Sequence, residues 1–182
     1  GSKPFITSVP GYEGDIGFIF TSEELFWKPY TLFRFLPSEI SEASLENFSQ
    51  PQHSFSIIKN GSAFVLTDLE RQLAGWDSVN VGRYLTYLFN IPFEKWALEL
   101  TNDEEEKIVN EEPLYRITVK DNKGVEQSVR LWQRWNYTDG KKVADDDRLW
   151  GMKDKGGRIF IIRYFDIDPI LKKRSYFFDE NI

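Results

Sequence analysis

The chain has 182 residues, 41% of them hydrophobic and 16% aromatic, which excludes a disordered chain and suffices for one well-buried core. Its formal net charge of −6 argues against a nucleic-acid-binding protein, which needs a basic face. There are no cysteines and no apolar run as long as a membrane span, which excludes disulfides, thiolate catalysis, cysteine-ligated zinc and a transmembrane helix in these residues.

The N-terminal part is predicted to form short strands or packed loops. Gly1 and Ser2 are typical of residues left by cleavage of an expression tag, so the natural N-terminus, with any signal peptide or lipid anchor, is expected to be missing. Residues 3–37 are extended and aromatic, and four prolines interrupt any helical pattern: Pro4, Pro10, Pro29 and Pro37. Residues 39–45 fit either one helical turn or a strand, and the hairpin that follows favours the strand.

A hairpin and a helix are the clearest elements of the first half. Residues 54–68 alternate in polarity around Asn60-Gly61, which predicts a hairpin. Residues 77–90 are predicted to form the main helix, capped by Asp77 or Ser78. Its buried face should hold the residues at helical spacing: Val81, Tyr84, Leu85, Leu88 and Phe89. The residues after this helix, 92–100, are read as another strand.

The acidic segment 101–112 is either an exposed helical turn or a solvated loop. It is also the candidate boundary inside the chain. We expect one domain over residues 1–182, with a possible division into two lobes, 3–100 and 113–182, on either side of this segment.

An aromatic β meander is predicted for residues 114–165. Its turns are Lys123-Gly124, Asp139-Gly140 and Gly156-Gly157. Residues 159–165 are apolar on both faces, which predicts a central strand covered on both sides.

The C-terminal residues are predicted to add a short helix and a tail. Asp168 is expected to cap a helix of about residues 168–173, with Pro169 at its first position. Residues 176–178 should form a last strand or a packed tail. The fold class is therefore α+β, with antiparallel sheet built from hairpins and a meander, and the main and C-terminal helices packed on it.

No pattern in the chain predicts catalysis, a metal or a cofactor. His53 is the only histidine, and without a nucleophile motif around Ser54 or Ser56 it is read as a surface or turn residue. The acidic runs 104–106 and 145–147 lack the spacing of a calcium loop. There is no glycine-rich phosphate loop and no dinucleotide fingerprint. We therefore expect a protein that is not an enzyme.

One basic and aromatic group is a tentative ligand-binding face. It comprises residues that alternate along one strand and two from the next segment: Arg130, Trp132, Arg134, Arg148 and Trp150. Such a face stacks on sugars or clamps an anion. In the alternative interpretation, Arg130 and Arg134 pair with residues 145–147 across the hairpin, and Trp132 covers them. This second interpretation, in which the arginines pair within the chain, is the favoured one.

Two stretches carry a family resemblance. The first is SFSIIKNGSAFVLTD with the helix around GRYLTYLF and a strand after it, and the second is RIFIIRYFDIDPILKKRSYFF. Together, over residues 40–178 in outline, they resemble a family of uncharacterised, lipoprotein-like envelope proteins of Bacteroidetes, a domain of unknown function. Relatives accompany gliding-type ABC transporter components. The resemblance implies a periplasmic or cell-surface location and a membrane anchor in the full-length protein, and it carries over no functional residue.

Three functions are weighed on this basis. The first is a non-enzymatic domain, exposed in the cell envelope, that binds a protein or an envelope component. The second is a carbohydrate-binding module that uses the arginines with Trp132, Trp135 and Trp150. The third, ranked last, is a carboxylate-dependent hydrolase.

Overall fold

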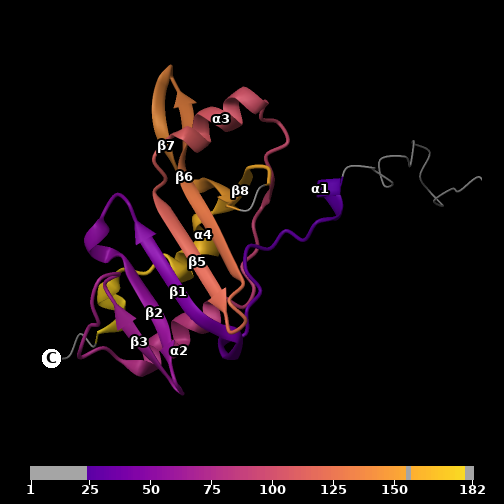
Figure 1. The fold of residues 1–182 in the computed structure, drawn as a ribbon. Helices are drawn as coiled ribbons and strands as arrows, with labels where there is room; N and C mark the ends of the chain where they lie inside the picture. Colours follow the sequence, from indigo (N-terminus) through magenta and orange to yellow (C-terminus); the bar gives the residue numbers. More distant parts are fainter. Residues whose placement is uncertain (1–23, 155–156, 179–182) are drawn as a thin grey trace, which may run out of the picture.

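The protein is built on a single antiparallel sheet (Figure 1). A computed structural model describes residues 24–154 and 157–178. Within these residues the sheet has eight strands in the order β3-β2-β1-β5-β6-β7-β8-β4. The α+β prediction is confirmed. In chain order the strands are β1 (Ile40–Asn47), β2 (Phe55–Asn60), β3 (Ala63–Thr67), β4 (Lys95–Trp96), β5 (Tyr115–Asp121), β6 (Glu126–Thr138), β7 (Lys141–Lys153) and β8 (Phe160–Arg163).

The sheet takes strands from both sides of the acidic segment. The hairpin β2–β3 is joined through β1 to β5, which follows that segment. At the other end, the two-residue strand β4, which precedes the segment, pairs with β8. The residues expected to form two lobes therefore share one sheet, and strand β4 is much shorter than the strand predicted for residues 92–100.

The predicted turns close the hairpins. Asp139 and Gly140 both have positive φ, 52° and 72°, and Thr138 pairs with Lys141, as a two-residue turn of the primed type requires. In the first hairpin the turn residues are shifted by one. Asn60 pairs with Ala63, which leaves Gly61 and Ser62 as the turn, and Gly61 has a φ of 63°. Of the predicted Gly156-Gly157 turn, the first residue lies outside the described residues.

The main helix, α2 (Ser78–Tyr87), is confirmed. The side chain of Asp77 caps it by accepting a hydrogen bond of 2.8 Å from the backbone N–H of Val79. Tyr84 is fully buried and its hydroxyl donates to the backbone oxygen of Ile170. The prediction for Phe89 was wrong, because the helix ends at Tyr87. Phe89 lies beyond the last turn, where helical spacing no longer decides which face a side chain takes, and it is exposed.

The acidic segment contains a helix, α3 (Asn102–Asn110). Thr101 begins it with a capping box, in which its hydroxyl and the carboxylate of Glu104 bond each other's backbone N–H groups. The hydrogen bonds to Thr101 lower the pKa of the Glu104 carboxyl, and the bond from the backbone N–H of Thr101 has the largest effect. Burial acts to raise this pKa but is outweighed. The pKa of Glu104 is therefore below its usual value. The solvated-loop alternative for this segment is thereby excluded.

The remaining helices are short and differ from the prediction. A turn of helix, α1 (Glu24–Trp27), occurs where strands or loops were expected, while residues 3–23 of that prediction lie outside the described residues. The C-terminal helix α4 (Tyr164–Ile167) starts directly after β8, and a 3-10 turn (Asp168–Ile170) continues it. Asp168 therefore ends α4 instead of capping a new helix. A last 3-10 turn, Arg174–Phe177, is the packed tail.

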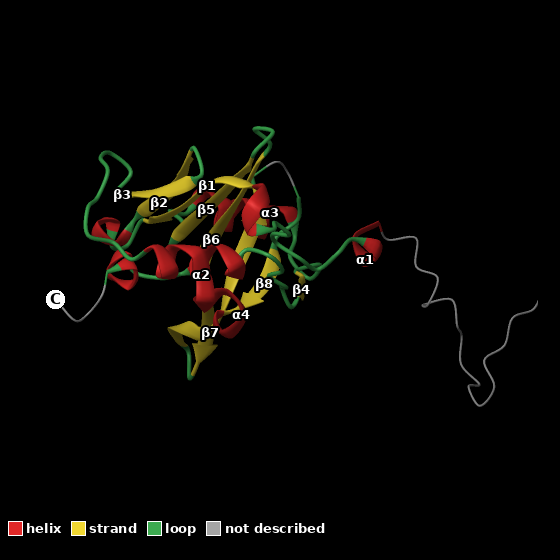
Figure 2. Cartoon of the chain, turned by 90° about the horizontal axis from the view of Figure 1, so that it is seen from below, coloured by secondary structure: helices red, strands yellow, loops and turns green. Residues whose placement is uncertain are grey.

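The two faces of the sheet are covered differently. Helix α2 lies against one face, over the large core (Figure 2). On the opposite face a smaller cluster packs Ile108 and Val109 of α3 against Ile159 and Ile161. Strand β8 is thus buried on both sides, as predicted, although its place in the sheet is next to the edge. Within the described residues no helix is long and apolar enough to cross a membrane.

Candidate functional site

The tryptophans of the predicted ligand face lie side by side on β6 and β7 but are covered. Trp132 pairs with Trp150 in the register of the two strands. Trp132 is only 1% exposed, and its indole Nε1 donates a 2.9 Å hydrogen bond to the backbone oxygen of Glu111, just after α3. Trp150 is half-buried and belongs to the cluster under α3. The pair therefore acts as packing between the sheet and the α3 segment.

The three arginines of this face bind carboxylates of the protein itself. Arg134 pairs with Asp145 at 2.7 Å, as the favoured interpretation predicted. Arg130 pairs instead with Asp154, because its position on β6 lies opposite the far end of β7 and not opposite the acidic run. Arg148 contacts two carboxylates, those of Glu94 at 2.7 Å and Asp147 at 2.6 Å. Arg130 and Arg134 also lie over the rings of Trp132 and Trp150, at 5.1 and 5.0 Å.

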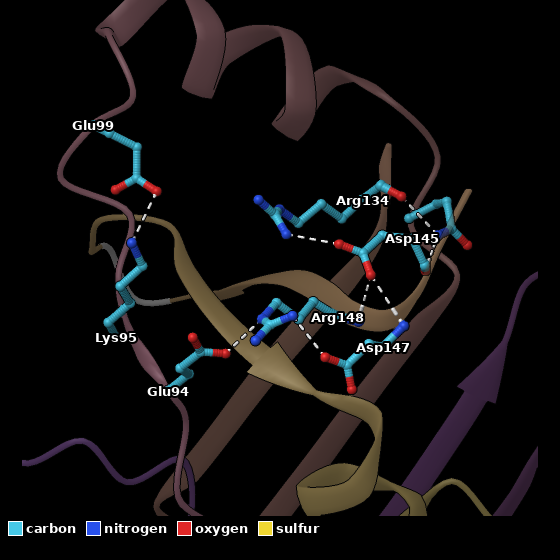
Figure 3. Close-up of polar contacts among 8 residues, drawn as sticks. Glu94, Lys95, Glu99, Arg134, Asp145, Asp147 and Arg148 are labelled. Carbon is cyan, nitrogen blue, oxygen red and sulfur yellow. Dashed lines mark hydrogen bonds and ion pairs between the residues drawn. The ribbon is translucent and has the colours of Figure 1, made fainter. Parts of the chain in front are cut away.

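The acidic run 145–147 forms a bulge in β7. Gln133 pairs with Leu149 and Trp135 pairs with Ala144, so residues 145–148 stand opposite Arg134 alone. Asp145 organises this bulge (Figure 3). Its buried carboxylate accepts 3.0 Å hydrogen bonds from the backbone N–H groups of Asp147 and Arg148. The same carboxylate forms the ion pair with Arg134. The acidic run is therefore a structural device.

These contacts set the titration of Asp145. Burial acts to raise the pKa of its carboxyl, but the backbone N–H groups of Asp147 and Arg148, assisted by the side chain of Asn136 and the charge of Arg134, outweigh burial and hold the pKa below its usual value. Because the folded pKa is lowered, the carboxylate stabilises the fold above the unfolded-state pKa, and this contribution is lost as the pH falls through the folded value.

We therefore expect an acid-dependent difference between the wild type and Asp145→Asn. The free energy of unfolding of the wild type should exceed that of the variant at neutral pH, and the difference should shrink below about pH 4. Urea unfolding at a series of pH values measures it. Asp146→Asn, at the exposed neighbouring position, is the control and should follow the wild type throughout. A difference that is constant with pH would contradict the assigned role of Asp145.

Beyond the bulge, β6 and β7 continue as a two-stranded arm, residues 135–144, called the β6–β7 arm (Figure 1). Trp135 and Tyr137 lie on one face of it and are 41% and 76% exposed. Lys142 lies over the ring of Trp135 at 4.4 Å, and Val143 is exposed on the other face. Among the described residues, the backbone of the arm forms hydrogen bonds only between its own two strands.

The arm was missed at the level of the sequence, except for Trp135. The alternation that continues from Trp132 through Arg134 changes at the bulge, so Trp135 and Tyr137 could not be assigned to a face. The signal that was present is the Asp139-Gly140 turn, which fixes the length of the hairpin beyond the bulge. That turn predicts a hairpin, but only the pairing of the neighbouring strands shows that the end of this hairpin extends past β5 and β8.

Comparisons with known proteins do not identify the chain: no family model, curated protein or solved structure matches it. The resemblance to the Bacteroidetes envelope family stays a prediction. Function is therefore inferred from the geometry of the described residues.

Proposed function

We propose that this chain is a non-enzymatic binding domain that recognises a protein partner through the β6–β7 arm. The observation that carries the proposal is the pair Trp135 and Tyr137, exposed on one face of a two-stranded arm that extends past the rest of the sheet. Tryptophan and tyrosine are enriched in protein interfaces, where each supplies a large contact area at a low cost in conformational entropy.

The backbone of the arm favours a protein over a glycan as the partner. Strand β5 pairs with β6 only as far as Leu131, and β8 pairs with β7 only from Arg148 onward. The outer edges of residues 135–144 thus have N–H and C=O groups directed away from the paired strand. An extended segment of another protein adds to such an edge by backbone hydrogen bonds, while alternate side chains provide specificity.

The bulge gives the arm a defined direction. Asp145 ties the backbone of β7 to Arg134 of β6 at the base of the arm, and the side chain of Gln133 donates to the backbone oxygens of Arg134 and Asp145. A preorganised arm loses little freedom on binding, which favours affinity. The carbohydrate alternative is less favoured, because Trp132 is buried and Arg134 is engaged by Asp145.

The expected partner is a component of the cell envelope. This part of the proposal is supported by the resemblance to Bacteroidetes envelope proteins alone. It is tested by comparing proteins captured from the solubilised envelope and from the cytoplasmic fraction of the same cells, with capture confined to the envelope fraction as the expected result.

The double variant Trp135→Ala/Tyr137→Ala should lose the partner. We expect the yield of specifically captured envelope proteins to fall about tenfold, since interface aromatic residues contribute most of the binding free energy. Quantitative mass spectrometry of matched pull-downs measures the change. Phe165→Ala, at an 83% exposed position on α4, is the matched control and should retain the same proteins as the wild type.

Two outcomes would refute the role of the arm. One is capture of the same proteins, in the same yield, by the double variant. The other is an equal loss in Phe165→Ala, which would indicate nonspecific adhesion to exposed aromatic residues. Both substitutions are at exposed sites, so urea unfolding should confirm that stability changes by no more than about 0.5 kcal/mol.

A further inference from the structure

A cavity of about 370 Å³ lies at the end of the sheet opposite the β6–β7 arm. Here the segment that leads from α1 to β1 passes the end of β7 (Figure 1). The side chain of Lys153 donates a 3.0 Å hydrogen bond to the backbone oxygen of Thr31 in this segment. A second cavity of about 270 Å³ shares Leu32, Gln127 and Lys153 with the first. Lys153 therefore borders both spaces.

The charge of the cavity is opposite to that of the chain. Three cationic side chains line it, Lys28, Arg34 and Lys153, and none of the described residues that line it is acidic. The chain as a whole has a net charge of −6. Lys28 is paired with Glu24 at 2.9 Å, whereas neither Arg34 nor Lys153 has a carboxylate within ion-pair distance in the described part of the chain. Two cations at the cavity thus lack an anionic partner among residues 24–154 and 157–178.

Of these two cations, Lys153 is the more buried and therefore loses more of its hydration. Its side chain is half-buried, and burial lowers the pKa of its amine. An ammonium has three N–H donors, and the bond to Thr31 uses one of them. The contact with Thr31 explains how Lys153 holds the crossing segment, but a neutral carbonyl does not balance a charge. An anion beside Lys153 would balance the charge of its ammonium group.

Trp96 adds an apolar wall to the cavity. It is buried beside the cavity, with its ring 4.8 Å from that of Phe93 and 6.2 Å from that of Phe160. Its indole Nε1 is buried and has no acceptor among the described residues. Because Nε1 is not accessible even from the cavity, Trp96 contributes its ring, and not this donor, to the cavity wall.

We infer that this cavity binds a small organic carboxylate with an apolar body. The carboxylate meets the cations Lys153 and Arg34, and the apolar body packs on Leu32, Phe33 and Trp96. The size fits, because a volume of 370 Å³ is at the small end of ligand pockets. The inference is independent of the β6–β7 arm, which lies at the other end of the sheet.

Octanoate is the probe, with octanol as the uncharged analogue of the same chain length, and isothermal titration calorimetry is the measurement. We expect octanoate to bind at least about tenfold more tightly than octanol, since only octanoate pairs with the two cations. Lys153→Met, which keeps the length of the side chain and removes its charge, should weaken octanoate by about tenfold and leave octanol unchanged. Lys107→Met, on the exposed side of α3, is the control and should bind as the wild type does.

Three results would overturn the inference: no binding of octanoate up to its solubility limit, equal affinity for octanol and octanoate, or an unchanged affinity for octanoate in Lys153→Met. Should Lys153→Met fail to fold, Arg34→Gln decides instead, because Arg34 is exposed and its replacement does not disturb packing. Arg34→Gln is expected to weaken octanoate alone, and an unchanged affinity there would be equally decisive against the site.

Discussion

Replacing Gly151 with alanine should lower the free energy of unfolding by about 3 kcal/mol, the upper part of the range for overpacked cores. Gly151 of β7 pairs with Phe160 of β8, and a Cβ atom added at Gly151 would overlap carbons of the Phe160 ring. That ring cannot move aside easily. It is fully buried and stacked on Phe93 at 4.6 Å, and Trp96, which packs against Phe93, meets the same ring at 6.2 Å.

A second glycine provides the matched control. Gly82 lies on the exposed side of α2, and no atom lies within 4 Å of an added Cβ. Gly82→Ala should therefore stabilise the protein by about 0.5–1 kcal/mol, through the higher helix propensity of alanine. Urea denaturation of both variants measures the two effects. If Gly151→Ala were as stable as the wild type, Phe160 would not be fixed over β7 as described.

Asp145→Ala should destabilise the protein by a similar amount, about 3 kcal/mol. The substitution leaves the Arg134 guanidinium without its carboxylate, and it leaves the N–H groups of Asp147 and Arg148 without an acceptor. It should also loosen the base of the β6–β7 arm, so that amides of residues 135–144 exchange with solvent faster than in the wild type. Hydrogen exchange measured by mass spectrometry detects this local change.

The neighbouring aspartate separates the role of Asp145 from a general effect of charge. Asp146 is exposed, and Asp146→Ala changes the net charge in the same way. We expect its free energy of unfolding to lie within about 0.5 kcal/mol of the wild type. Equal losses in the two variants would mean that repulsion or attraction across the acidic run, and not the hydrogen bonds of Asp145, determines stability.

Local signals in the sequence predicted the elements whose conformation depends on neighbouring residues. The Asp139-Gly140 turn and the hairpin of residues 54–68 follow from backbone preferences of two residues and from alternation beside them. The main helix follows from its spacing and from the cap at Asp77. The strand that was favoured over a helical turn for residues 39–45 is β1. It was favoured because a predicted hairpin follows it in the sequence.

What could not be predicted depends on residues far apart in the chain. Arg130 finds Asp154 because of the register between β6 and β7, which the bulge at residues 145–148 shifts. Trp132 is buried by the segment after α3, and no local pattern indicates that this segment returns to the sheet. The same holds for the cavity at Lys153, whose walls come from four separate parts of the chain.

The order of the strands also bears on how the protein folds. The β2–β3 hairpin reaches the rest of the sheet only through the pairing of β1 with β5, and the whole of α2, β4 and α3 separates these two strands along the chain. The pairing of β4 with β8 closes a similarly long loop. The tight turns can form quickly, but they do not build the core. We therefore expect the meeting of distant segments to limit the folding rate, because the entropy of closing these long loops must be overcome before their contacts stabilise the fold.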